Sequence, residues 1–202
     1  MVLTSMVMAS IQAAKAALRQ DIQNKVSTLS TEEKQRQSKI VLRKLLALPV
    51  FQTSQRVSVF LSTEDEINTE PVVRKIFEDG KTCFVPRYSK AGMQMVRLYS
   101  MDDWENLPLT KWNIKQPALK EQREDALETG GLDLIIIPGV AFTKEGFRMG
   151  HGGGYYDAFL TKCKTIQQNP PSTVAVTFKE QVLPDIPKTE KDVKIDIVLY
   201  AE

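Results

Sequence analysis

A chain of 202 residues, of which 42% are apolar, is long enough to bury one substantial hydrophobic core. Its formal net charge of only +2 argues against binding of nucleic acid or of an anionic membrane through bulk charge. Two cysteines, Cys83 and Cys163, are too few for a disulfide framework or a metal cluster, so we expect reduced packing residues. No apolar run reaches the roughly 18 residues of a membrane-spanning helix. These features predict one domain, residues 1–202, with neither nucleic acid nor membrane as a partner.

The first twenty residues contain Lys15 and Arg19 but no acidic residue. A secretory signal carries basic residues before its apolar stretch, and this segment does not. A mitochondrial presequence fits the composition better, because the segment can form an amphipathic helix. The segment also has a use in the folded protein, described below, so we predict a cytoplasmic protein and keep a mitochondrial one as the alternative.

Three helices are predicted in the first eighty residues. Apolar side chains recur at helical spacing over residues 11–26. Ser30 and Glu33 have the spacing of a capping box, which predicts a second helix that ends before Pro49. A third helix is predicted over residues 69–80, opened by a threonine and a proline and closed by a glycine.

Five strands are predicted from short apolar or alternating runs, at residues 56–61, 82–86, 93–98, 132–138 and 173–178. The fourth of them is apolar on both faces, as expected at the centre of a parallel sheet that helices cover on both sides. A tight turn is predicted at 143–146 and a helix at 155–168, whereas residues 100–131 are the least regular. Strands that alternate with helices predict an α/β layered domain with a mostly parallel sheet.

Residues 148–157 read RMGHGGGYYD and contain four closely spaced glycines, Gly150, Gly152, Gly153 and Gly154. Such density costs chain entropy and suits a backbone that approaches a ligand or uses positive φ. Successive amides in that conformation bind anions, and the N-terminus of the following helix adds partial positive charge. The pattern matches neither the P-loop nor the dinucleotide-binding fingerprint. It predicts a phosphate site; the alternative is a flexible surface loop.

Two charged side chains flank these glycines. Arg148 can bind phosphate oxygens as a fork. Asp157 lies about one turn into the expected helix, and a carboxylate beside polyphosphate is repulsive unless a cation lies between them. Mg²⁺ takes one or two carboxylates together with phosphate oxygens, so the pair predicts a magnesium-dependent nucleotide site. The alternative is that Asp157 only stabilises the helix dipole.

The segment 148–157 resembles the signature of the 5-formyltetrahydrofolate cyclo-ligases, also called 5,10-methenyltetrahydrofolate synthetases. The likeness extends over nearly the whole chain and follows the order of the family. The other segments that carry it are residues 15–19, 60–69, 84–88, 112–114, 129–134, 134–142 and 194–200.

This resemblance implies an enzyme of one-carbon metabolism that binds folate, ATP and magnesium. Its reaction would convert 5-formyltetrahydrofolate, polyglutamylated or not, into 5,10-methenyltetrahydrofolate while ATP becomes ADP and phosphate. The implied fold is a three-layer α/β/α sandwich with a mostly parallel sheet, related to the ribose-phosphate isomerase and CoA-transferase group. We also expect a monomer.

The resemblance assigns site residues as well. Arg148 and Asp157 would be catalytic, and Asp157 and Asp196 would hold magnesium. Those that would contact ATP are Lys15, Arg19, Arg148, Gly150, His151, Gly152, Gly153, Gly154, Tyr155 and Tyr156. Those that would contact the folate are Leu61, Glu66, Tyr88, Trp112 and Tyr155.

Several of these assignments have plainer alternatives when the residues are taken alone. Lys15 and Arg19, one turn apart, fit a solvated helix face. Glu66 fits an ordinary acidic loop, and Tyr88 and Trp112 fit core aromatics.

The single histidine, His151, invites assignment as a general base. Phosphoryl transfer to an amide oxygen removes no proton first, so we expect His151 to point outward or to contact phosphate.

Two other functions fit parts of the sequence. A related α/β enzyme that acts on a sugar phosphate or a CoA ester would use the glycine turn for substrate phosphate alone. An inactive nucleotide- or RNA-associated module would show a clustered basic face with exposed aromatic residues.

Overall fold

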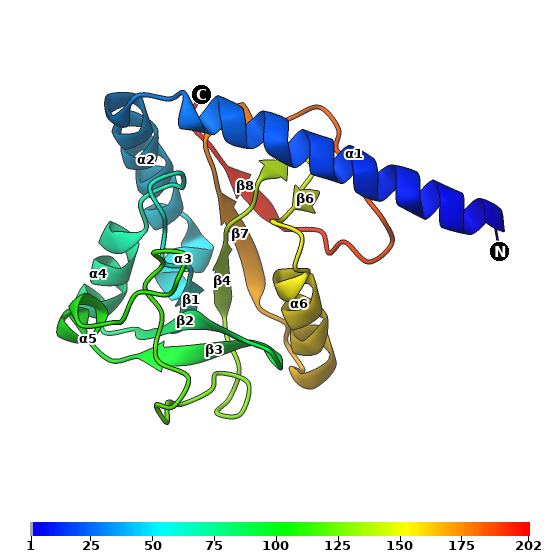
Figure 1. Ribbon diagram of the computed structural model, residues 1–202. Helices are drawn as coiled ribbons and strands as arrows, with labels where there is room; N and C mark the ends of the chain where they lie inside the picture. The colour runs from blue at the N-terminus through cyan, green and yellow to red at the C-terminus, as the bar shows by residue number, and fades with distance from the viewer. Residues whose placement is uncertain (1) are drawn as a thin grey trace.

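A computed structural model describes residues 2–202, with side chains from residue 9 onward. Its framework is a six-stranded sheet in the order β3-β2-β1-β4-β7-β8 (Figure 1). All neighbouring strands are parallel except the β2–β3 pair, which is antiparallel. The predicted, mostly parallel sheet is therefore confirmed. The strands are β1 (Arg56–Val59), β2 (Thr82–Ser89), β3 (Gly92–Leu98), β4 (Leu134–Ile137), β7 (Ser172–Val176) and β8 (Ile197–Leu199).

Helices cover both faces of this sheet. Figure 1 shows α2 and α4 on one side of the sheet, α6 on the other side, and α1 across one end of the strands. This is the predicted three-layer α/β/α arrangement. The helices are α1 (Val2–Ser27), α2 (Thr31–Leu46), α3 (Pro49–Thr53), α4 (Glu70–Glu78), α5 (Met101–Glu105) and α6 (Tyr155–Ile166), with a short 3-10 helix η1 (Lys179–Gln181).

Alternation along β4 divides the interior into two cores. Leu134 and Ile136 belong to the core that α1, α2 and α4 share, whereas Ile135 belongs to the core of α6. All four residues of β4 are fully buried. Burying one such side chain stabilises the fold by about 1.5–3 kcal/mol, so both helical layers depend on this central strand.

The start of α2 uses only half of the predicted capping box. The Ser30 hydroxyl accepts a hydrogen bond from the Glu33 amide at 3.1 Å. The Glu33 carboxylate, however, binds Arg36 at 2.6 and 2.7 Å instead of reaching back to the backbone. The hydrogen bonds from Arg36 lower the pKa of Glu33 to about 2.

Other differences concern short elements. The sequence patterns did not indicate α3 and α5, each only five residues long. The predicted turn at 143–146 closes a small hairpin of β5 (Ala141–Phe142) and β6 (Arg148–Met149). Helix α1 also begins earlier than predicted, at Val2.

Both cysteines lie in the interior, as predicted, and neither is in a disulfide. Burial raises the pKa of the Cys83 thiol well above its usual range and that of Cys163 to about 11. Within residues 2–202, no helix combines the length and the apolar character needed to cross a bilayer.

The topology places a binding region at one end of the sheet. Strand β1 lies between β2 and β4. After β1 the chain adds β2 and β3 on one side of it, and it then adds β4, β7 and β8 on the other side. Ligands of open α/β sheets bind beyond the carboxyl ends of the strands at such a reversal of strand order. The segments that follow β1 and β4 are therefore expected to border the functional site.

We expect Ile136→Ala to lower the free energy of unfolding by about 2–5 kcal/mol, because it leaves a cavity in the central strand. Urea denaturation followed by circular dichroism measures this change. The matched control is Leu109→Ala at a side chain that is 61% exposed, which should change stability by no more than about 0.5 kcal/mol. Equal effects of the two substitutions would contradict the central role of β4.

Candidate functional site

A cavity of about 1110 Å³ lies beyond the carboxyl ends of β1, β2 and β4. Residues that follow β1 and β4 border it, together with the glycine turn, one side of α1 and the loop 189–193. Every predicted site residue except Asp196 lines this cavity. They are Lys15, Arg19, Leu61, Glu66, Tyr88, Trp112, Arg148, Gly150, His151, Gly152, Gly153, Gly154, Tyr155, Tyr156 and Asp157.

The glycine turn joins β6 to α6 and uses its glycines in two ways. Gly152 and Gly154 have φ of +109° and +67°, in the region that side chains other than glycine avoid. At Gly150 and Gly153 the constraint is space, because a Cβ would lie 2.8 Å from Arg148 and 2.7 Å from the Tyr155 ring. Among the described residues no side chain caps the start of α6 after Gly154, so its first amides can bind an anion.

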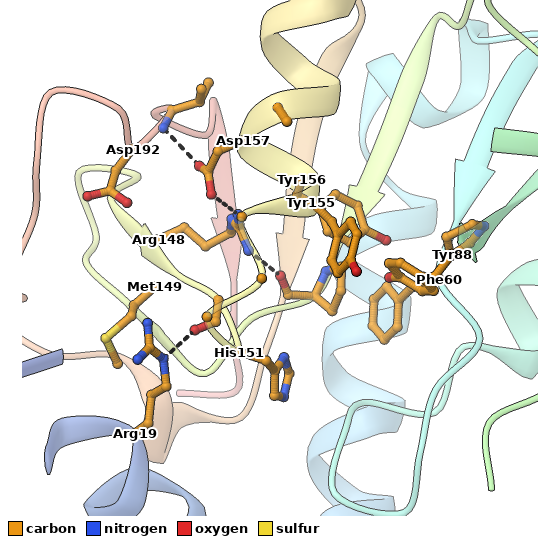
Figure 2. A pocket seen from close by; sticks show the side chains of 18 of the residues that line it. Arg19, Phe60, Tyr88, Arg148, Met149, His151, Tyr155, Tyr156, Asp157 and Asp192 are labelled. Atoms are coloured by element: carbon orange, nitrogen blue, oxygen red, sulfur yellow. Dashed lines mark hydrogen bonds and ion pairs between the residues drawn. The ribbon is translucent and has the colours of Figure 1, made fainter. Parts of the chain in front are cut away.

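Arg148 is 4% exposed and crosses beneath this turn. Its guanidinium donates to the Pro138 carbonyl at 3.3 Å and to the Asp157 carboxylate at 3.0 Å. The second oxygen of Asp157 accepts from the Val193 amide at 3.0 Å. Figure 2 shows the resulting chain of contacts from the end of β4, through Arg148, to the first turn of α6.

Helix α1 contributes two cations to the same half of the cavity. The Lys15 ammonium lies 2.8 and 2.6 Å from the two carboxylate oxygens of Asp192. The Lys15 side chain is only 7% exposed, so the alternative of a solvated helix face is wrong for this residue. Arg19 donates from Nε to the Gly150 carbonyl at 2.8 Å. Helix α1 is thereby fixed to both the glycine turn and the loop 189–193.

Aromatic side chains form the opposite half of the cavity (Figure 2). The Tyr88 and Tyr155 rings meet edge to face, with centroids 5.1 Å apart. Burial raises the pKa of Tyr88 to about 12 and raises the pKa of Tyr156 well above its usual range. The buried Tyr156 hydroxyl interacts with Tyr88 but has no well-formed hydrogen bond within the described residues, so a ligand can still bind it. Trp112 is 67% exposed at the rim, and the core-aromatic alternative is wrong for it.

Glu66 differs from the exposed acids that precede it, Glu64 and Asp65. Its carboxylate accepts hydrogen bonds from the Thr63 amide at 2.8 Å and the Thr63 hydroxyl at 3.1 Å. Burial of the carboxyl group in the cavity raises the pKa of Glu66, which the Thr63 bonds and the nearby His151 only partly offset. An acidic group with a raised pKa in a cavity is a candidate for ligand recognition.

Asp196 does not line the cavity, so the expectation that it shares a metal with Asp157 is wrong for this arrangement. Its carboxylate accepts from the Thr173 amide at 2.8 Å and the Thr173 hydroxyl at 2.7 Å, which ties β8 to β7 at a separate hollow. Asp192, which was not among the predicted site residues, lines the cavity with Asp157 instead.

Asp192 is held in place by its own loop. The Thr189 amide and hydroxyl donate to its carboxylate at 2.6 and 3.1 Å. Burial opposes its charge, but the hydrogen bonds from Lys15 and from Thr189 outweigh burial and keep the pKa of Asp192 below its usual value. Position 192 shares an alternating polar and apolar stretch with position 196, and that pattern alone does not distinguish the two.

Comparison with known proteins gives one consistent family. Residues 11–201 match the sequence model of the 5-formyltetrahydrofolate cyclo-ligase family. The chain is 46% identical to the 5-formyltetrahydrofolate cyclo-ligase of Mus musculus over 195 residues, covering 96% of each chain. It is 41% identical to a probable 5-formyltetrahydrofolate cyclo-ligase of Caenorhabditis elegans, covering 96% of this chain and 95% of the relative.

Solved structures agree with this family. The NMR structure of the Aquifex aeolicus 5,10-methenyltetrahydrofolate synthetase aligns with a TM-score of 0.74 at 28% identity. That alignment covers 92% of this chain and 88% of the Aquifex chain. A 5,10-methenyltetrahydrofolate synthetase from Mycoplasma pneumoniae aligns with a TM-score of 0.71 at 19% identity, which supports the fold alone; it covers 93% of this chain and 99% of the other.

We expect Glu66→Gln to change how stability depends on pH. Above the ordinary pKa of 4.5, folded Glu66 still binds its proton while the unfolded chain releases it, so wild-type stability falls as pH rises. Glutamine does not titrate and keeps an oxygen for the Thr63 amide. Urea denaturation should therefore show the variant gaining stability relative to wild type as the pH rises above 4.5.

Glu64→Gln, an exposed carboxyl in the same loop, is the matched control and should follow the wild-type pH dependence. Parallel pH profiles for wild type and Glu66→Gln would show that burial does not hold a proton on Glu66.

Proposed function

Because the chain belongs to the 5-formyltetrahydrofolate cyclo-ligase family, we propose that it converts 5-formyltetrahydrofolate and ATP into 5,10-methenyltetrahydrofolate, ADP and phosphate. One observation carries the proposal beyond family membership. A single cavity combines a cationic, glycine-lined half with an aromatic half that contains a buried carboxyl group. A phosphate-rich nucleotide and a flat heterocycle are the two kinds of ligand that such halves fit.

The chemical task explains why both ligands must meet. The oxygen of a formamide is a poor leaving group, so N10 of the folate cannot expel it as hydroxide at neutral pH. Transfer of the γ-phosphoryl group to the formyl oxygen gives an imino-phosphate. N10 then attacks the formyl carbon and loses its proton, and the C–O bond breaks with release of phosphate, which can take up that proton. The protein mainly has to align the formyl oxygen with the γ-phosphate and stabilise the spread negative charge.

In this proposal the nucleotide lies in the cationic half. The free amides at the start of α6 and the glycine turn bind phosphate oxygens, and Tyr155 and Tyr156 border the junction with the folate. Lys15, Arg19 and Arg148 supply charge-assisted hydrogen bonds to the phosphates. Arg148 is the strongest candidate for contact with the transferred group, because it lies beneath the turn that would hold the phosphates.

The same half suits magnesium. Asp157 and Asp192 both line it, and Mg²⁺ is held by one or two carboxylates with phosphate oxygens and water completing the octahedron. Among the described residues no cluster of three or more His, Cys, Asp or Glu side chains could hold a metal, which favours a cation shared with the nucleotide over an all-protein site. When bound, such a cation neutralises charge on the β- and γ-phosphates.

The folate is assigned to the aromatic half. Leu61 and the Tyr88 ring offer apolar surface to the pterin, and Trp112 lies at the rim where the rest of the molecule would leave the cavity. The Tyr156 hydroxyl and the Glu66 carboxyl group supply polar contacts inside the cavity. Protonated Glu66 can donate to a pterin acceptor, and ionised Glu66 can accept from pterin N–H groups.

We propose that the protein acts as a monomer. We also propose a cytoplasmic location. A mitochondrial location is the alternative, because a relative from Arabidopsis thaliana that is 28% identical is named as a mitochondrial 5-formyltetrahydrofolate cyclo-ligase.

We expect the purified protein to produce the near-ultraviolet absorbance of a methenyl folate from 5-formyltetrahydrofolate only when ATP and MgCl₂ are both present. Arg148→Gln should lower kcat by about 10²–10³-fold, since it removes a charged group that stabilises the transferred phosphoryl. Arg43→Gln, at an exposed position on α2 away from the cavity, should keep wild-type kcat. Initial rates at varied ATP and folate concentrations separate kcat from KM.

ATP-independent turnover, with no effect of Asp157→Ala, would favour the sugar-phosphate or CoA-ester alternative. Absence of methenyl product with every nucleoside triphosphate would exclude cyclo-ligase activity.

A further inference from the structure

The three cations proposed to bind the phosphates, Lys15, Arg19 and Arg148, are not equally available. Lys15 is paired with the Asp192 carboxylate, and Arg148 is paired with the Asp157 carboxylate. Arg19 differs, because its only hydrogen bond among the described residues goes from Nε to the neutral carbonyl of Gly150. Two of the three cations therefore already have an anionic partner before any phosphate arrives.

We propose that Asp192 and Asp157 withhold Lys15 and Arg148 from the nucleotide until a divalent cation takes over the two carboxylates. Metal and nucleotide would then bind as a coupled pair, and each would bind weakly without the other. This inference rests on the proposed function and deepens it, because it assigns the metal dependence of nucleotide binding to two named ion pairs.

Because both ion pairs are largely buried, their carboxylates strongly affect a phosphate that approaches the paired cations. The side chains of Lys15 and Asp192 are 7% and 16% exposed, and those of Arg148 and Asp157 are 3% and 19% exposed. At such sites charges are poorly screened, so a phosphate that approaches Lys15 also meets the negative charge of Asp192 at close range. A cation bound to Asp192 would remove that repulsion and free the Lys15 ammonium for a phosphate oxygen.

The loop 189–193 keeps the Asp192 carboxylate in this position. Thr189 binds it through both its amide and its hydroxyl, independently of Lys15. The carboxylate would therefore stay in place after Lys15 leaves, ready to coordinate a cation. Similarly, the Val193 amide holds one oxygen of Asp157 without involving Arg148.

Within the part of the chain that the structure describes, Arg19 is the unpaired cation with which the two paired cations, Lys15 and Arg148, can be compared. A Cβ added at Gly152 would lie 3.6 to 3.8 Å from the Arg19 guanidinium, so its terminal nitrogens lie directly under the glycine turn. Because no carboxylate pairs with Arg19 in the described residues, its contribution to phosphate binding should be similar with and without metal.

The test is calorimetric titration of the full chain with ATP, once in MgCl₂ and once in EDTA. We expect Asp192→Asn to bind ATP about tenfold more tightly than wild type in EDTA, since Lys15 is released to a phosphate. In MgCl₂ the same variant should bind ATP more weakly than wild type. For the variant, the Kd in EDTA divided by the Kd in MgCl₂ should therefore be smaller than for wild type. Asparagine keeps the shape of aspartate and an oxygen for the Thr189 amide.

Two controls separate release of Lys15 from simple removal of a negative charge. Glu190→Gln removes an exposed acid from the same loop that pairs with no cation, and its gain in EDTA should stay below about twofold. In the double variant Lys15→Gln/Asp192→Asn, the tenfold gain should disappear, because the released cation is missing. Arg19→Gln should weaken ATP binding by a similar factor in both media.

Asp157→Asn is a second, independent test, because it releases Arg148 instead of Lys15. We expect the same increase in affinity for ATP in EDTA. Circular dichroism of each variant checks that it is folded. The inference would be overturned if both Asn variants bound ATP in EDTA as wild type does, or if the gain in affinity persisted without Lys15. In either case, binding of MgATP by wild type would leave the proposed function intact. Failure of wild type to bind MgATP would overturn the proposed function itself and the inference with it.

Discussion

The ion pair between Arg148 and Asp157 closes the segment on which the rest of the site depends. The two residues flank the glycine turn, so their 3.0 Å contact fixes the end of β6 against the first turn of α6. The backbone between them includes two glycines at positive φ, a conformation that loses much chain entropy on folding. Arg148 also binds the Pro138 carbonyl at the end of β4, and this contact anchors the turn to the central strand independently of Asp157.

The sheet in turn brings the aromatic half to the glycine turn. Leu61 follows β1 and Tyr88 lies near the end of β2, and both strands are held by parallel pairing and by two buried cores. Side chains on such rigid elements lose little further entropy when a ligand binds, whereas the glycine turn supplies amides that adapt to phosphate. The reversal of strand order at β1 is therefore what makes a two-substrate cavity possible in one small domain.

Patterns that arise from one local cause were predictable from the sequence. The apolar run of β4 and the glycine density before Tyr155 each reflect a requirement of their own segment, and both predictions of local structure were confirmed. Choices between competing partners or positions were not predictable. The Glu33 carboxylate can bind the backbone or Arg36, and only the folded helix decides. Asp192 and Asp196 belong to one alternating stretch, and the course of the loop determines which carboxylate faces the cavity.

The cations that hold α1 in place are also those proposed to bind the nucleotide. The middle of this helix is largely exposed, and its fully buried apolar residues, Ile22 and Val26, lie near its C-terminal end. Toward the N-terminus, Lys15 and Arg19 make the hydrogen bonds that hold the helix against the cavity. These are the cations proposed to bind phosphates, so a nucleotide would replace part of what docks α1. Nucleotide binding and the placement of this helix are thus energetically linked.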